Sequence, residues 1–241
     1  MVWLSDEERF WAIEENLKII SNDIAEAALC SGRSFEDIGL MAVTKTVEPR
    51  FINKAIECGI SLIGENKVQE FLLKEPDLLL DSCKAHLIGH LQSNKVRKIV
   101  GKVDTIQSVD TFDIAREIGK RSVMQGITTN ILLEVNVGNE DSKFGFTADE
   151  LFERACEIAE IDGGCINGLM CVAPICEKEA EIRAVFSNMR RMFIDIGAKK
   201  IDNINMNILS MGMSGDYESA ILEGANLVRI GSAIFGARIY R

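Results

Sequence analysis

The chain has 241 residues, of which 47% are hydrophobic and 27% charged, a balance typical of a folded globular protein. Its 27 Lys and Arg against 37 Asp and Glu give a net charge of −10, which argues against a nucleic-acid partner because phosphate backbones are bound chiefly by cations. The longest uncharged stretch, residues 163–176, contains Gly, Asn and Pro and is shorter than the about 20 apolar residues that a membrane-spanning helix needs.

Seven cysteines and two histidines bear on the compartment and on metal binding. The number of cysteines is odd and none of them forms a C-x-x-C pair. With His86 and His90 as the only histidines, the sequence offers few ligands for a zinc site. We therefore expect reduced thiols in a cytoplasmic protein and no bound metal. Residues 1–15 are acidic and lack the basic start and apolar block of a signal peptide.

The chain opens with the pattern of a long amphipathic helix. Ser5 followed by Glu8 fits a capping box that begins the helix, and Gly32 is a suitable residue to end it. Between them, apolar residues recur at helical spacing at Phe10, Ile13, Leu17, Ile20, Ile24 and Ala27. The sequence therefore predicts one helix with a single buried face.

Beyond this helix, short apolar runs alternate with helical patterns. The strand-like runs are residues 38–45, 62–65, 85–91, 105–109, 131–137, 166–173, 207–211 and 227–230. Candidate N-caps for the helices between them are Asn66, Ser93 with Asn94, Thr147 and Ser214. Runs that are apolar on both faces and separated by helices are typical of a parallel sheet covered by helices.

This alternation predicts an α/β protein with a single (β/α)8 TIM barrel, which we expect to span residues 1–241 as one domain. The N-terminal helix is extra, and it would fill the place in the outer ring that a helix after the last strand would take. An open doubly wound sheet is the alternative. The absence of a G-x-G-x-x-G motif after the first strand weighs against it.

The C-terminal ends of the strands form the active face of such a barrel. The residues there are Lys45, Asn66, Gln92 with Asn94, Ser108, Asn136, Ser210 with Ser214, and Arg229 with Ser232. Lys45 shares a strand face with Met41 and Val43, so a lumen-facing position would enclose its ammonium among apolar neighbours. Burial lowers the pKa of a lysine and makes the neutral amine a nucleophile for an aldehyde. A surface lysine beyond the strand end is the alternative.

Two turns near the end of the chain have the composition of a phosphate site. Residues 210–216 join a strand to a helix, and Gly231 and Ser232 follow Arg229 at the end of the last strand. Barrels commonly hold phosphate at these positions through main-chain N–H groups, small residues and hydroxyls. A tight turn at Gly212 with a helix cap at Ser214 is the alternative.

Three features at one barrel mouth suggest pyridoxal 5′-phosphate (PLP) as the ligand. They are an amine that can form an imine, an arginine, and the two turns with the composition of a phosphate site, which we call the phosphate cup. A permanent cation at Arg229 would disfavour protonation of the pyridine nitrogen and leave the ring a weak electron sink, so racemisation or storage is favoured over transamination. A structural ion pair is the alternative role for Arg229. We interpret His86 as a core histidine and His90 as the better candidate for contacting a ligand.

Five motifs follow one another along nearly the whole chain. They are Ala42-Val43-Thr44-Lys45, Gly64-Glu65-Asn66 with Val68-Gln69-Glu70, His86-x-Ile88-Gly89-x-Leu91-Gln92-x-Asn94-Lys95, Ser210-Met211-Gly212-Met213-Ser214-x-Asp216 and Val228-Arg229-Ile230-Gly231-Ser232. Each alone would be weak, but together they resemble, with high specificity, the YggS/PROSC family of pyridoxal phosphate homeostasis proteins.

The resemblance implies a barrel similar to the N-terminal domain of bacterial alanine racemase, with PLP in Schiff-base linkage to Lys45. It implies contacts to the cofactor phosphate, a contact of Arg229 with the pyridine nitrogen, and a place for Asn66 near the cofactor. The phosphate-binding residues that it implies are Ser210, Gly231 and Ser232, with Met213 and Ser214 nearby. Members of the family are regarded as binding and supplying PLP, without an established catalytic reaction.

The leading hypothesis is therefore a PLP carrier without catalytic turnover, a monomer or weak dimer whose partners are PLP and apo forms of PLP-dependent enzymes, with no nucleic acid or membrane. The main rival is a PLP-dependent amino-acid racemase with His90 as second base. Racemisation needs an acid or base opposite the lysine, commonly a tyrosine, and the chain has only Tyr217 and Tyr240. A class I aldolase that uses Lys45 on a phosphorylated sugar is a third hypothesis.

Overall fold

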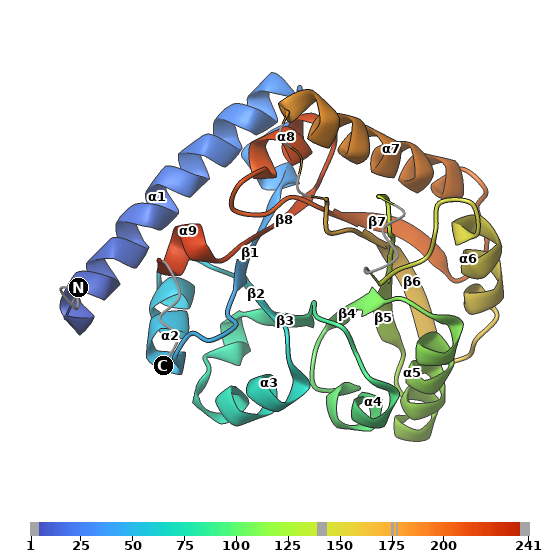
Figure 1. Ribbon diagram of the computed structural model, residues 1–241. Helices are drawn as coiled ribbons and strands as arrows, with labels where there is room; N and C mark the ends of the chain where they lie inside the picture. The colour runs from blue at the N-terminus through green and yellow to red at the C-terminus, as the bar shows by residue number, and fades with distance from the viewer. Residues whose placement is uncertain (1–4, 139–143, 175, 177, 237–241) are drawn as a thin grey trace.

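The computed structural model describes residues 5–138, 144–174, 176 and 178–236. Its strands are all parallel and close into a barrel in chain order, with β8 bonded back to β1 (Figure 1). They are β1 (Gly39–Val43), β2 (Leu62–Glu65), β3 (Lys84–Leu87), β4 (Thr105–Val109), β5 (Thr129–Glu134), β6 (Gly164–Met170), β7 (Ile204–Ser210) and β8 (Leu227–Ile230). The predicted TIM barrel is confirmed.

Helices connect the strands and form an outer ring around them (Figure 1). They are α1 (Asp6–Cys30), α2 (Pro49–Glu57), α3 (Val68–Lys74), α4 (Ser93–Ile99), α5 (Phe112–Gln125), α6 (Leu151–Ala159), α7 (Glu179–Gly197), α8 (Tyr217–Leu222) and α9 (Ser232–Phe235). No helix in these described ranges combines the length and apolar character needed to cross a bilayer.

The extra N-terminal helix, α1, begins where the sequence predicts. The N–H of Ser5 donates to Oε2 of Glu8 at 2.6 Å, and the N–H of Glu8 donates to Oγ of Ser5 at 3.2 Å, which completes the capping box. The helix packs against α2, α8 and α9, and the side-chain amide of Asn16 donates to the carbonyl of Ile234 at 3.0 Å. It therefore covers the place where the ring closes (Figure 1).

One expectation about this closure is wrong, because a helix does follow the last strand. α9 comes directly after β8 and lies between α1 and the barrel (Figure 1). It has only four residues, too few for a helical repeat of apolar positions to be visible in the sequence. α1 therefore covers α9 instead of replacing it.

The strand boundaries differ from the predicted ones by a few residues. Strands end at Val43, Leu87, Glu134 and Met170, where the apolar runs extend to residues 45, 91, 137 and 173. Loop residues such as Leu91 and Val135 are buried in the core and prolong the apolar pattern past the strand ends. Conversely, β7 begins at Ile204 instead of residue 207. Its first residues alternate between the partly buried Ile204 and Met206 and the exposed Asn205 and Asn207, so they do not form the continuous apolar run that the prediction looks for.

Most of the predicted helix caps are also displaced. The residues at the N-cap positions of α3, α4 and α8 are Lys67, Gln92 and Asp216, none with a side-chain cap bond, so the caps predicted at Asn66, Ser93 with Asn94, and Ser214 are wrong. Thr147 and Glu150 do exchange the expected hydrogen bonds, at 2.8 and 3.4 Å, but α6 begins only at Leu151. The pair therefore closes the turn that precedes the helix.

Candidate functional site

The pairing of β1 with β8 brings the beginning and the end of the chain together at the barrel mouth. Met41 is the register partner of Arg229. Further along the two strands, a Cβ added to Gly231 would lie 3.3 Å from both Cβ and the carbonyl oxygen of Val43. Lys45 follows Val43 by two residues and therefore comes shortly after this contact between the two strand ends.

Lys45 lies in a turn beyond its strand. β1 ends at Val43, and Lys45 and Thr46 form a turn after it. The alternation that predicts a lumen-facing lysine therefore stops short of this residue. Met41 is fully buried, whereas Lys45 is half-buried. The lysine side chain thus starts from the rim of the barrel, above the packed lumen.

The two candidate phosphate turns contact each other. The main-chain N–H of Gly231 donates to Oγ of Ser214 at 3.3 Å, so this hydroxyl ties the turn after β7 to the turn after β8. Ser214 lies two residues before Asp216, the N-cap residue of α8, so its hydroxyl serves this contact and not a helix cap. Ser232 is exposed and begins α9 immediately after Gly231. Two hydroxyls and a residue without a side chain therefore lie at the end of β8.

The turn after β7 depends on a glycine and on an aspartate. Gly212 has a φ of +92°, and a Cβ added to it would lie 2.6 Å from Cβ of Ala220. The main-chain N–H of Met213 donates to Oδ1 of Asp216 at 2.5 Å. Burial raises the pKa of Asp216, which its hydrogen bond with Met213 partly offsets. The turn is therefore internally fixed, with the side chain of Met213 partly exposed.

Arg229 is buried in the lumen and belongs to a chain of hydrogen bonds. Its Nη1 donates to Oγ of Ser210 at 2.6 Å, and its Nη2 donates to the carbonyl of Cys171 at 2.7 Å. The Ser210 hydroxyl in turn donates to Oε1 of Gln107 at 2.7 Å. Burial lowers the pKa of Arg229, which the surrounding Cys171, Glu134 and Asp216 oppose. Ser210 thus contacts the arginine below the phosphate turns.

The same chain ends on His86. The side-chain amide nitrogen of Gln107 lies 2.8 Å from Nδ1 of His86. Burial lowers the pKa of His86 to about 4, so the ring is neutral near pH 7 and its Nδ1 accepts the hydrogen bond. The interpretation of His86 as a core histidine with a hydrogen-bond partner is confirmed.

Two acids, Glu134 and Asp110, lie near each other at the ends of β5 and β4. Glu134 ends β5, and burial, reinforced by the nearby Asp110, raises its pKa to about 7, against the opposing influence of Arg229. Asp110 directly follows β4 and is buried. Its Oδ1 is the only buried side-chain polar atom without a hydrogen-bond partner among the described residues.

His90 lies beside this acid group. Its Nδ1 is 2.7 Å from Oδ2 of Asp110, and its ring stacks on Phe144 with the centroids 3.8 Å apart. More than a third of the His90 side chain is exposed, whereas the Asp110 side chain is 2% exposed. A buried carboxylate therefore orients a partly exposed imidazole beyond the end of β3, and contact of His90 with a ligand stays a prediction.

Asn66 lies between β2 and α3, and its main chain is tightly packed. Its N–H donates to Oε1 of Glu65 at 2.7 Å. A Cβ added to Gly89 would lie 2.2 Å from the carbonyl oxygen of Asn66, so the loop after β3 rests on this residue. These contacts involve only the main chain of Asn66, so they do not engage its side chain.

The structure brings most of the predicted site residues to the mouth between β7, β8 and β1. Ser214, Gly231 and Ser232 lie around the end of β8, where Gly231 meets Val43, two residues before Lys45. The sequence analysis does not identify three further polar residues of this region, which are Glu134, Asp110 and Gln107. The sequence carries a signal for Asp110, a charged residue directly after the apolar run 105–109, but none for Glu134, which lies within the run 131–137.

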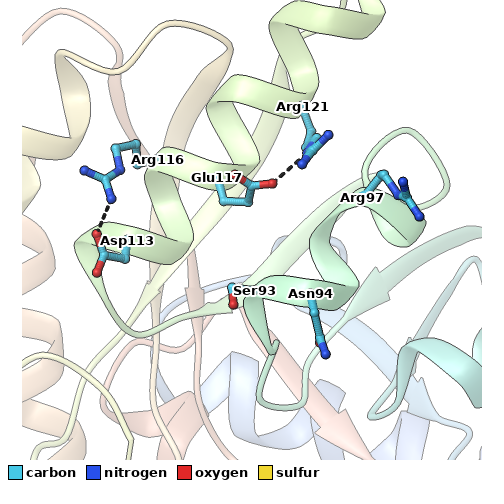
Figure 2. A pocket seen from close by; sticks show the side chains of 7 residues that line it. All are labelled: Ser93, Asn94, Arg97, Asp113, Arg116, Glu117 and Arg121. Atoms are coloured by element: carbon cyan, nitrogen blue, oxygen red, sulfur yellow. Dashed lines mark hydrogen bonds and ion pairs between the residues drawn. The ribbon is translucent and has the colours of Figure 1, made fainter.

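A separate hollow of about 520 Å³ lies on the outer ring, between α4 and α5 (Figure 2). Its lining residues are Ser93, Asn94, Arg97, Asp113, Arg116, Glu117 and Arg121. Arg116 and Arg121 each pair with an acid of α5, at 2.7 and 2.6 Å, so most of the charge is balanced within the hollow. Among the described residues, no group of three or more His, Cys, Asp or Glu side chains is arranged to hold a metal ion.

Comparisons with known proteins agree on one family. Residues 12–239 match the model of the alanine racemase N-terminal domain. A pyridoxal phosphate homeostasis protein of Aquifex aeolicus is 38% identical over 94% of this chain and 98% of its own length. An unknown protein from Bifidobacterium adolescentis has a solved structure with a TM-score of 0.91, 37% identity, and coverage of 97% and 98% of the two chains. PipY of Synechococcus elongatus, solved with PLP bound, has a TM-score of 0.76, 31% identity, and coverage of 88% and 100%.

Proposed function

Because the chain belongs to the family of pyridoxal phosphate homeostasis proteins, built on the barrel of the alanine racemase N-terminal domain, we propose that it binds PLP and acts in the homeostasis of this cofactor. The observation that supports the proposal is the pairing of β1 with β8, which brings Val43, two residues before Lys45, against Gly231. PLP carries both an aldehyde, which an amine such as that of Lys45 can bind, and a phosphate, which a turn such as that at Gly231 can hold.

The residues at the mouth fit the two ends of this cofactor. A Cβ added to Gly231 would lie 3.3 Å from Val43, so a side chain here would crowd the end of β1, whereas a glycine lets the two strand ends approach closely. The Ser214 hydroxyl already accepts from the N–H of Gly231, and Ser232 is exposed beside it. These residues, with Ser210 and Met213, would hold the phosphate, and Lys45 would form the Schiff base.

Bound PLP would supply an electron-withdrawing ring, and Arg229 would limit its strength. The guanidinium is buried and held by Ser210 and by the carbonyl of Cys171, and in this position it would face the pyridine nitrogen. A cation in that place disfavours a proton on the nitrogen, so the ring stabilises a carbanion poorly. We expect storage and supply of the cofactor instead of turnover. Asn66, at the rim beside Glu65, would border the cofactor.

The test is the intact mass of the protein after incubation with PLP and reduction with borohydride. The expected result is the mass increment of one reduced cofactor on the peptide that contains Lys45, together with loss of the absorbance of the Schiff base. Lys45→Ala should show neither. An unmodified wild-type protein, or a modification that persists in Lys45→Ala, would contradict the proposal.

A PLP-dependent racemase is the second candidate, and the pair of His90 and Asp110 favours it. An imidazole oriented by a buried carboxylate is a suitable acid or base. Tyr217 does not fit that role, because its hydroxyl donates to Oδ2 of Asp23 at 2.8 Å, and Tyr240 lies outside the described residues. Interconversion of the enantiomers of an amino acid, lost in His90→Ala, would establish this candidate. Its absence would favour the carrier.

For the setting of this function, we propose the cytoplasm, with apo forms of PLP-dependent enzymes as recipients and a monomer or weak dimer as the working form. No disulfide forms among the described residues, which include all seven cysteines, and this suits a reducing compartment. Transfer to a purified apo-enzyme, followed by its recovered activity when a trap removes free PLP, would support direct delivery. Recovery that disappears with the trap would indicate release into solution.

A further inference from the structure

Behind the turn that carries Lys45 lies a buried ion cluster between β2 and α3. Nζ of Lys74 is 2.9 Å from Oε2 of Glu65 and 2.6 Å from Oε1 of Glu70. The exposed fractions of these side chains are 11% for Lys74, 2% for Glu65 and 23% for Glu70. Two carboxylates and one ammonium are thus withdrawn from water, an arrangement that contributes little to stability compared with apolar packing.

The hydrogen bonds of this cluster go to the two residues that flank Lys45. The Thr44 hydroxyl donates to Oε2 of Glu65 at 3.0 Å, and Nζ of Lys74 donates to the carbonyl of Thr44 at 2.8 Å. On the other side, the main-chain N–H of Thr46 donates to Oε1 of Glu70 at 2.5 Å. The backbone is therefore anchored immediately before and immediately after Lys45.

The backbone at Thr46 needs such an anchor. Its φ is +64°, a left-handed conformation that a β-branched residue rarely adopts. Its own hydroxyl donates to the carbonyl of Lys45 at 2.6 Å, which closes the turn on the lysine. A strained conformation persists only where the surroundings determine it, and the hydrogen bond to Glu70 is the long-range contact that does so here.

We propose that Glu70, with Lys74 and Glu65, positions Lys45 for attack on the aldehyde of a cofactor held by the turns after β7 and β8. The proposal rests on the proposed function. In that step, neutral Nζ of Lys45 forms a bond to the aldehyde carbon, and the carbonyl oxygen leaves as water with both amine hydrogens, which gives the C=N bond. Glu65, Glu70 and Lys74 touch none of the reacting atoms and act only through the backbone around Lys45.

The experiment separates phosphate binding from formation of the C=N bond. Pyridoxine 5′-phosphate carries an alcohol in place of the aldehyde, so it reports on the phosphate cup alone. The first-order rate of Schiff-base formation at saturating PLP, followed by absorbance, reports on the lysine. In Glu70→Ala, we expect this rate to fall about tenfold to a hundredfold, because a loosened nucleophile spends less time in the reactive geometry. Affinity for pyridoxine 5′-phosphate should stay within about twofold of wild type.

A matched control is available on α5. Glu117 pairs with Arg121 at 2.6 Å, also four residues apart in a helix, and its side chain is as exposed as that of Glu70. Glu117→Ala should leave the rate of Schiff-base formation unchanged. Glu70→Gln keeps an oxygen that accepts from the N–H of Thr46 but loses the charge that holds Lys74, so we expect an intermediate rate. This variant also carries the test where Glu70→Ala does not fold.

The outcomes distinguish this inference from the proposed function. Equal rates of Schiff-base formation in wild type and in both Glu70 variants would overturn the inference and leave the proposed function standing. A parallel loss of affinity for pyridoxine 5′-phosphate would also overturn it, since the cluster would then act on the whole mouth. A wild-type protein that binds pyridoxine 5′-phosphate but forms no Schiff base would overturn the role of Lys45, and the inference with it.

Discussion

The hydroxyl of Ser210 lies 2.6 Å from Nη1 of Arg229 and donates its one proton to Gln107. From the motifs alone, Ser210 is expected at the phosphate and Arg229 at the ring nitrogen. In the structure, both belong to one buried hydrogen-bond chain across the lumen. Ser210 therefore has a second role that the motif does not reveal, as the group that satisfies the buried guanidinium.

This role predicts a loss of stability in Ser210→Ala. Removal of the hydroxyl leaves Nη1 of Arg229 and Oε1 of Gln107 buried with one partner fewer, which costs about 1–3 kcal/mol of unfolding free energy. Ser232→Ala is the control, because the Ser232 hydroxyl is exposed, and we expect a change of less than about 0.5 kcal/mol. Urea denaturation of the unloaded proteins measures both. Equal stability of the two variants would contradict the prediction.

Removal of the cation from the cluster behind Lys45 should be more costly still. Lys74→Ala leaves the buried Glu65 without its counter-ion, and breaking a buried pair in this way costs about 3–5 kcal/mol. Lys102→Ala is the matched control. Lys102 pairs with Glu75 at 2.8 Å, but its side chain is half-exposed, so we expect a loss of less than about 1 kcal/mol. Thermal or urea unfolding of the two variants gives the comparison, and similar losses would argue against a buried cluster.

The fold was predictable because a barrel repeats one simple pattern. Each apolar run and the helix after it appear in the sequence, and strands that are buried on both faces need no long-range information to be recognised. The register between strands is a different matter. The chain from Arg229 through Ser210 and Gln107 to His86 joins four strands, and only their stagger in three dimensions brings these side chains together.

Errors at strand ends also hid part of the site. The sequence predicts a strand over residues 131–137. This strand would contain Glu134 in its middle, where the carboxylate gives no sign of belonging to a site. The strand in fact ends at Glu134, and the side chain lies beside Asp110 and Arg229. Thr46 gives no sequence signal at all, because its left-handed backbone is imposed by contacts from another element.

The raised pKa of Glu134 predicts that stability falls as pH rises. Burial raises the pKa from its ordinary value of 4.5 to about 7, so between these values the folded protein holds a proton that the unfolded chain has released. The contribution of the neutral Glu134 carboxyl to the free energy of unfolding is therefore fully present below pH 4.5. It declines between pH 4.5 and pH 7 and is lost above pH 7. Glu134→Gln should lack this decline, so its stability relative to wild type should be roughly 3 kcal/mol more favourable at pH 8 than at pH 4.5. Urea unfolding at the two pH values measures the difference, and parallel pH profiles would refute the assignment to Glu134.

The turn after β7 allows a last, sharply controlled test of the phosphate cup. At Gly212, an added Cβ would lie 2.6 Å from Cβ of Ala220, and the φ of +92° disfavours any other residue, so Gly212→Ala should cost about 2 kcal/mol of stability. At Gly215, an added Cβ meets nothing within 4 Å, and Gly215→Ala should stay within about 0.5 kcal/mol of wild type. Because this turn meets Gly231 through Ser214, distortion at Gly212 should also weaken binding of pyridoxine 5′-phosphate, by about tenfold. Titration calorimetry with that ligand, on variants first shown to be folded, checks the claim, and unchanged affinity in Gly212→Ala would separate the turn from the phosphate site.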